Sequence, residues 1–149
     1  MNRKKVFPPT GLLVAILVMA ALHFVLPATL VIPSPWNLLG LFPLILGAAL
    51  NVAGDNLFRK LGTTIRPGEP STVLVTSGLF RLSRNPMYLG FALILTGIAT
   101  LLGSLLPFIV IPVFAAWIDR TFIQVEERML ADQFGAAWTA YRKKTRRWI

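Results

Sequence analysis

Four apolar stretches, separated by short turns or basic loops, constrain this chain more than any other feature of its sequence. Each stretch approaches the roughly 20 residues that an α-helix needs to cross a bilayer. We therefore predict an all-α polytopic membrane protein that forms a single domain over residues 1–149. Its predicted parts are four transmembrane helices at about 10–31, 36–58, 86–102 and 105–123, a cytoplasmic loop at 59–85, and a C-terminal cytoplasmic or interfacial helix and tail at 124–149.

The composition excludes several other classes of protein. Hydrophobic residues make up 55% of the chain, and its net charge of +9 is gathered in short clusters between the apolar stretches. A nucleic-acid-binding domain would spread such charge over a soluble face, so we predict no nucleic-acid partner. The chain has no cysteine, which excludes disulfides and thiolate sites. The single histidine, His23, has no histidine partner, so we predict that it packs or forms a hydrogen bond within a helix and that no metal is bound.

The basic residues also predict the orientation of the chain. They lie near the N-terminus, in the loop 59–85 and in the tail, whereas the turns at 33–35 and 103–104 carry none. Cytoplasmic loops of membrane proteins are enriched in Lys and Arg. We therefore predict an integral protein of the inner (cytoplasmic) membrane, with both termini and the active site facing the cytoplasm.

Small residues recur along the second apolar stretch. Gly40, Gly47 and Gly54 are seven residues apart, so they stay near one face of a helix and let a neighbouring helix approach closely. Asn51 and Asp55 extend this face with polar groups, and a carboxylate at that depth is costly unless it is paired or faces a wet cavity. We predict that both bind substrate, with helix capping or an interfacial position as the alternative for Asp55.

The polar turn before the third apolar stretch is a candidate site. Asn85 is a favourable N-cap and Pro86 suits the first helical position, so a helix should begin at Pro86 and run into the membrane. The free N–H groups and the dipole of a helix start attract anions, and Arg81 and Arg84 lie just before it. The alternative is that these arginines only fix the cytoplasmic side of the helix.

Two adjacent glutamates after the fourth apolar stretch form a second candidate site. Glu126 and Glu127 have no basic residue three or four positions away along a helix. We therefore expect the two glutamates to have partners that are distant in sequence. The alternative is that the glutamates are solvated, or that they bridge to Arg81 or Arg84 across the loop. The aromatic and basic tail beyond them is typical of a segment at the membrane interface.

These two regions together resemble a known family. Residues 84–90 (RNPMYLG) are similar to the R-[HN]-P-x-Y-x-G signature of isoprenylcysteine carboxyl methyltransferases and related phospholipid N-methyltransferases. Residues 126–141 and the basic pair at 146–147 resemble the C-terminal pattern of the same family, and the resemblance extends weakly back to residues 63–67. These are integral-membrane enzymes that use S-adenosylmethionine without a Rossmann domain, and this chain has no G-x-G-x-x-G motif.

The resemblance implies a site for S-adenosylmethionine between the start of the third helix and the C-terminal helix. The residues that it implies for cofactor binding are Arg84, Asn85, Pro86, Tyr88, Leu89, Gly90, Glu126 and Glu127. The catalytic residues would be Arg84, Glu126 and Glu127, and the substrate-binding residues Asn51, Asp55, Thr64, Tyr141 and Arg147. The glutamates would accept hydrogen bonds from ribose hydroxyls, Arg84 and the helix start would hold the methionyl carboxylate, and Gly90 would let the ligand lie against the backbone.

The implied activity is methyl transfer from S-adenosylmethionine to a lipophilic acceptor. Candidate acceptors are an isoprenylcysteine-like carboxylate, a phospholipid amine and a small hydrophobic metabolite, and the residues do not distinguish O-, N- and S-methylation. The acceptor should enter from the lipid through a gap between the second and fourth helices. Many prenylcysteine enzymes have histidine where this chain has Asn85, and asparagine cannot act as an ionisable base. The alternative function is a non-catalytic membrane scaffold or lipid-binding assembly protein.

Overall fold

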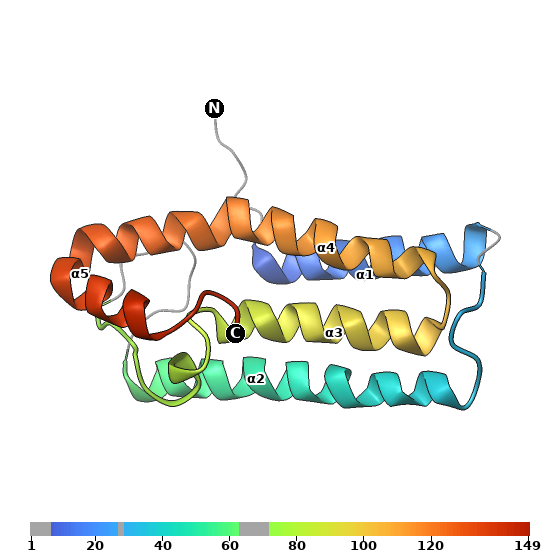
Figure 1. The fold of residues 1–149 in the computed structure, drawn as a ribbon, viewed down its shortest axis with the longest axis horizontal. Coiled ribbons are helices and arrows are strands. Elements are labelled where there is room, and N and C mark those ends of the chain that lie inside the picture. Colours follow the sequence, from blue (N-terminus) through green and yellow to red (C-terminus); the bar gives the residue numbers. More distant parts are fainter. Residues whose placement is uncertain (1–6, 27–28, 63–71) are drawn as a thin grey trace.

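The computed structural model describes residues 7–26, 29–62 and 72–149, and helices dominate these residues (Figure 1). The helices in chain order are α1 (Pro8–Val25), η1 (Trp36–Gly40), α2 (Leu41–Lys60), η2 (Gly78–Arg81), α3 (Pro86–Leu102), α4 (Leu106–Ile118), η3 (Asp119–Ile123) and α5 (Gln124–Lys144). Segments η1 and η2 are 3₁₀-helical and η3 is π-helical. The predicted all-α fold is confirmed for the described residues, within which the sole β pairing is an isolated bridge between Leu30 and Ser104.

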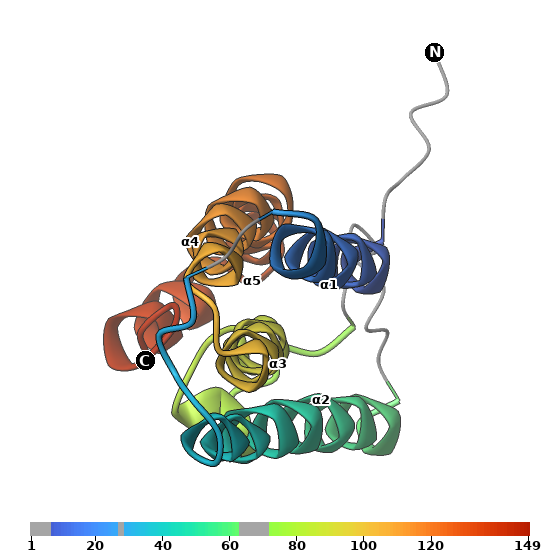
Figure 2. The ribbon, with the colours of Figure 1, turned by 90° about the vertical axis from the view of Figure 1, so that its right-hand side faces the viewer.

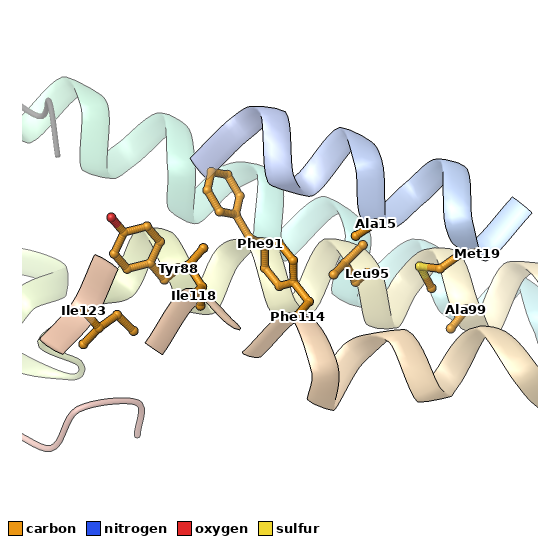
Figure 3. Packing of buried hydrophobic residues seen from close by; sticks show 9 residues of the cluster. All are labelled: Ala15, Met19, Tyr88, Phe91, Leu95, Ala99, Phe114, Ile118 and Ile123. Carbon is orange, nitrogen blue, oxygen red and sulfur yellow. The ribbon is translucent and has the colours of Figure 1, made fainter. Parts of the chain in front are cut away.

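Helix α3 lies at the centre of the bundle. Helices α1 and α4 pack against one side of it and α2 covers the opposite side (Figure 2). The buried core lies between α1, α3, α4 and η3, where apolar side chains form a row along the bundle (Figure 3). Tyr88 and Ile123 stand at one end of this row, and Met19 and Ala99 stand at the other. The core therefore fixes the start of α3 against η3, at the junction between α4 and α5.

The boundaries of α1 differ from the predicted stretch at 10–31. The helix begins at Pro8, two residues before the predicted start, because the first turn of a helix leaves its N–H groups unpaired and tolerates proline. It ends at Val25, six residues earlier than predicted. Leu26 has an extended backbone (φ −98°, ψ 142°), and the sequence places Pro27 after it, which disfavours the α conformation at the preceding residue.

Three helical segments within the described residues are long and apolar enough to cross a membrane: Pro8–Val25, Trp36–Lys60 and Leu106–Lys144. Helix α3, predicted as a fourth span, has the predicted bounds and is apolar, but its 17 residues make it shorter than the other three. Large apolar side chains on α1 and α2, including Leu17, Phe24 and Phe42, are exposed on the outside of the bundle. This distribution is that of a protein solvated by lipid.

The predicted glycine face of α2 packs against α3. A Cβ atom added at Gly47 would collide with the carbonyl oxygen of Gly90, and one added at Gly40 would collide with that of Gly97. At Gly54 it would lie 2.7 Å from Cγ of Met87. The two backbones therefore approach each other more closely than larger residues would allow. The prediction of a gap between the second and fourth helices was wrong, because α3 fills the space between α2 and α4 (Figure 2).

The opposite end of the bundle, where α1 and α3 end, is closed by polar contacts between its two turns. His23 Nδ1 and Ser104 Oγ are 2.7 Å apart, so the prediction of a hydrogen-bonded histidine is confirmed. The amides of Val31 and Ile32 donate to the Gly103 carbonyl at 2.8 and 3.0 Å. Gly103 adopts φ +71°, a conformation that favours glycine and lets α3 turn tightly into α4.

We expect valine at position 47 to destabilise the protein by ~1–3 kcal/mol, since its side chain would be forced into the Gly90 backbone. Ala48→Val is the matched control, because Ala48 is exposed on the same helix and receives the same β-branched residue. Thermal unfolding of both variants in detergent checks this. Equal melting temperatures for Gly47→Val and Ala48→Val would contradict the close packing of α2 on α3.

Candidate functional site

One helical rod, formed by α4, η3 and α5, carries the two glutamates to the end of the bundle where α3 begins (Figure 1). Its π-helical segment η3 inserts an extra residue into the helical repeat, and such insertions are frequent at functional sites. Asp119 opens this segment, and its Oδ2 accepts a hydrogen bond of 2.8 Å from Gln124 Nε2. Further along, Gly135 has φ +47° and ψ −113°, which breaks α5 and turns its second half back towards the bundle.

Helix α3 begins at Pro86, as predicted, but Asn85 does not cap it with its side chain. The Asn85 Nδ2 amide instead donates to the carbonyl of Arg147 at 3.1 Å, and the Asn85 backbone N–H donates to Ser83 Oγ at 3.0 Å. The side-chain capping role predicted for Asn85 was therefore wrong. Its amide binds a chain segment that lies more than 60 residues away, and this contact competes with the cap.

The candidate residues Arg84 and Glu127 form a buried ion pair. Arg84 Nη2 and Nε lie 2.9 and 3.1 Å from Glu127 Oε1, and the two side chains are only 8% and 10% exposed. Arg84 Nη1 donates to the carbonyls of Arg142 and Thr145, both at 3.2 Å. The Arg84 guanidinium also lies 5.7 Å from the centroid of the Trp138 ring. Arg84 therefore joins the start of α3 to both halves of α5.

Arg147, predicted to bind substrate, contacts the same glutamate from the other side. Its Nη2 lies 2.6 Å from Glu127 Oε2, and its Nε lies 3.2 Å from Oε1. Its Nη1 lies 3.0 Å from Asp119 Oδ1. The hydrogen bond to Glu127 raises the pKa of Arg147 above its ordinary value, against the opposing effect of burial, and Asp119 adds to the rise. Two guanidinium groups and two carboxylates thus form one continuous ion-pair network.

Glu126 belongs to a separate contact beside this network. The Tyr88 hydroxyl donates a hydrogen bond of 2.6 Å to Glu126 Oε1. Tyr88 is buried and lies close to Phe91 and Phe122, with ring centroids 6.3 and 6.4 Å away. In residues 7–26, 29–62 and 72–149, no arginine or lysine pairs with Glu126 and no second donor binds its carboxylate. Among the described residues, Glu126 is therefore bound by a phenol alone, whereas Glu127 is held by two arginines.

Tyr141 lies in a second hydrophobic cluster, with Val75, Phe80 and Trp138. Its hydroxyl donates to the carbonyl of Phe80 at 2.6 Å, which fixes the turn before Arg84 against the second half of α5. This contact gives Tyr141 a role in the fold, and its predicted contact with substrate stays a prediction.

The glycine at position 90 faces α2. The space that a side chain would occupy there is filled by Asn51 and by the carbonyl of Gly47. The reason for predicting a ligand against the Gly90 backbone was therefore wrong. Pro86 is buried at the helix start, and Leu89 is half-buried on the turn that follows.

Asn51 and Asp55, predicted to bind substrate, lie on α2, and the partners that they bind are not members of the ion-pair network. Asn51 donates to the carbonyl of Gly47 at 2.9 Å, and Asp55 pairs with Arg59 one turn further on at 2.7 Å. The pairing of Asp55 satisfies its charge within its own helix. Thr64 lies outside the described residues. The substrate-binding roles of these residues stay predictions.

The sequence alone did not indicate Asp119 as part of this site. It is one of only six acidic residues, and it stands at the end of a strongly apolar stretch, which is the signal that could have identified it. Within the described residues, no group of three or more His, Asp or Glu side chains is placed to hold a metal ion. The site therefore consists of an ion-pair network beside a carboxylate–phenol pair, at the start of a helix.

Comparison with known proteins identifies one family. Residues 35–137 match the phospholipid methyltransferase family, a region that runs from the residue before η1 into the second half of α5 and contains residues 84–90 and both adjacent glutamates. No curated protein and no solved structure matches the chain.

Removing the charge of Glu127 should destabilise the fold. Glu127→Gln leaves Arg84 buried without an anionic partner, and breaking a buried pair in this way costs ~3–5 kcal/mol. Asp132→Asn, at an exposed position on the same helix, is the matched control and should have the melting temperature of the unmodified protein. Thermal unfolding in detergent measures both, and a Glu127→Gln variant as stable as the control would show that the pair contributes nothing.

Proposed function

The chain belongs to the phospholipid methyltransferase family, and we propose that it transfers a methyl group from S-adenosylmethionine to a lipophilic acceptor in the membrane. The family supports methyl transfer at a membrane. We further propose that the methyl donor is S-adenosylmethionine, that residues of the two motifs hold it, and that the acceptor is lipophilic.

The observation that carries the proposal is the meeting of the two motifs. Arg84 and Glu127 are 43 residues apart in sequence and 2.9 Å apart in space. Tyr88 and Glu126, from the same two motifs, are joined by a hydrogen bond of 2.6 Å. Both contacts lie at the start of α3, where unpaired backbone N–H groups and the helix dipole favour an anion.

Some of the residues at the start of α3 fit S-adenosylmethionine in the way that the resemblance implies, and others do not. Glu126 would accept hydrogen bonds from the ribose hydroxyls. The first amides of α3 would hold the methionyl carboxylate, supported by the positive charge of Arg84. Arg84 cannot also grip that carboxylate with several hydrogen bonds, since Glu127 and two carbonyls already occupy its Nε, Nη1 and Nη2.

When bound, S-adenosylmethionine supplies a methyl group on a positively charged sulfur. The task of the protein is then to hold donor and acceptor in line and to exclude water, since positioning can supply a large part of the rate. The Tyr88 ring, whose hydroxyl binds Glu126, lies beside Phe91 and Phe122, so the phenol that binds this acid has apolar neighbours. For an amine acceptor, the proton lost before attack would pass to Glu126, which has no arginine partner within residues 7–26, 29–62 and 72–149.

A phospholipid amine is the acceptor that the family match favours among the three candidates. Asn85 agrees with this choice, because many of the prenylcysteine enzymes that the first motif resembles have histidine at this position. Asn51 and Asp55, on the part of α2 that faces the start of α3, are the residues that we propose for acceptor contact.

The basic residues support the proposed orientation in the membrane. Arg59, Lys60, Arg81 and the basic last turn of α5 all stand at the end of the bundle where α3 begins. Since such residues favour the cytoplasmic side, we place the site at the inner leaflet, with α3 as a fourth, short span.

A non-catalytic scaffold is the second candidate function, and one observation favours it. Glu127 already has two arginine partners inside the protein, so the network could serve the fold alone. This reading predicts that the protein does not bind S-adenosylmethionine or its demethylated product.

We expect the purified protein to bind S-adenosylhomocysteine with micromolar affinity in isothermal titration calorimetry. Glu126→Gln should weaken binding about tenfold, because the ribose hydroxyls lose a charged acceptor. Asp132→Asn serves as the control and should bind like the unmodified protein. Absence of heat at millimolar ligand, with a protein that still unfolds cooperatively, would favour the scaffold.

The acceptor can be identified by mass spectrometry of membrane lipids incubated with the protein and methyl-labelled S-adenosylmethionine. We expect label in the headgroup amine of a phospholipid, and none in a reaction with Glu126→Gln at the same protein concentration. Label that appears instead in an ester of a prenylated thiol would contradict the choice of an amine acceptor.

A further inference from the structure

Residues 145–149, which we call the strap, run across the start of α3. The backbone N–H of Arg84 donates to the Arg146 carbonyl at 2.9 Å, and Arg84 Nη1 donates to the Thr145 carbonyl at 3.2 Å. Ser83 Oγ and Asn85 Nδ2 both donate to the Arg147 carbonyl, at 3.2 and 3.1 Å. Three consecutive residues before α3 thus bind three consecutive carbonyls of the strap.

Part of the strap is also buried against the rest of the protein, whereas Arg146 and Ile149 are exposed. Thr145 is 6% exposed, and Trp148 packs against the core cluster that contains Tyr88 and Ile123. The strap therefore forms one side of the site, next to the turn that carries the first family motif.

Arg147 gives the strap its charged contacts. Its guanidinium binds both oxygens of Glu127 and also Oδ1 of Asp119, so it joins α5 to η3. A planar guanidinium can bridge two carboxylates with fixed geometry, which the single ammonium group of lysine cannot reproduce. The charges of Arg84, Arg147, Glu127 and Asp119 add to zero, and Glu126 lies outside this network with no arginine partner in the described part of the chain.

We infer that Arg147 is a positioning residue: together with Asp119 it fixes Glu127 and the strap, and thereby sets the placement of Glu126 and the start of α3 around the cofactor. This inference rests on the proposed function for its effect on ligand affinity. Direct contact of Arg147 with substrate is disfavoured, because it would break hydrogen bonds to two partly buried carboxylates and leave them unpaired.

A variant of Asp119 distinguishes the two possible roles of Arg147, which are positioning and direct contact with the ligand. Asp119→Asn removes one charge from the far end of the network while Arg147 keeps Glu127, so no buried charge is left without a partner. If Arg147 acts through position, this remote change loosens the strap. If Arg147 itself contacts the ligand, Asp119→Asn has no effect, because the guanidinium stays in place.

Hydrogen–deuterium exchange of the ligand-free protein in detergent is the primary test. We expect Asp119→Asn and Arg147→Lys each to increase exchange in the peptide that contains the Arg84 amide, which the strap protects. Asp132→Asn, the control, should leave this exchange unchanged. The inference is overturned if Asp119→Asn exchanges like the control. This measurement needs no cofactor, so it tests whether Arg147 and Asp119 hold the strap in place even if the proposed function is wrong.

Binding of S-adenosylhomocysteine then tests the positioning role. We expect Asp119→Asn and Arg147→Lys each to weaken binding about fivefold. The loss of affinity in the double variant should be smaller than the product of the two single losses, since residues in contact are energetically coupled. Loss of affinity in Arg147→Lys alone, with Asp119→Asn unchanged, would overturn positioning in favour of direct contact. Absence of binding by the unmodified protein would refute the proposed function and leave the exchange result standing.

Discussion

The structure around the candidate site depends on the placement of Glu127 between two arginines. A carboxylate with an exposed fraction of 10% is stable as an anion only if charged partners replace the water that it has lost. Arg84 comes from the turn before α3 and Arg147 from the segment after α5, so this single requirement joins three parts of the chain. The backbone contacts between residues 83–85 and 145–147 follow the same path, and the Trp138 ring covers the Arg84 guanidinium. Polar interactions therefore hold the end of the bundle where α3 begins, whereas apolar packing and close backbone contact hold its middle.

The two adjacent glutamates do different things because of the helix that carries them. Neighbouring positions on an α-helix point about 100° apart, so Glu127 faces the arginines while Glu126 faces Tyr88. One carboxylate is neutralised by the protein itself, and the other shares a hydrogen bond with a phenol in an aromatic surrounding. Glu127 therefore organises the ion-pair network, whereas Glu126 takes part in a separate contact with Tyr88.

Much of the fold could be predicted from the sequence, because a membrane helix is indicated by the length of its apolar stretch and by proline and glycine at its ends. The bounds of α3 and the glycine contact between α2 and α3 follow from such local patterns. The absence of basic neighbours along the helix also indicated that Glu127 has a distant partner. Its second partner, Arg147, and the role of Asp119 could not be predicted in this way, because helical spacing describes only neighbours within one helix. The π-helical segment changes that spacing just before the glutamates, and the Asn85 amide binds a backbone carbonyl, which carries no sequence signal.

The rod formed by α4, η3 and α5 runs without a break from residue 106 to the turn at Gly135. Its first part is solvated by lipid, and its later part carries both glutamates. A helix in a bilayer tilts in response to the thickness of the hydrocarbon layer. Because the rod is continuous and the core packs η3 against the start of α3, a change of tilt at α4 acts on the packing around Tyr88, which links the lipid environment to the site.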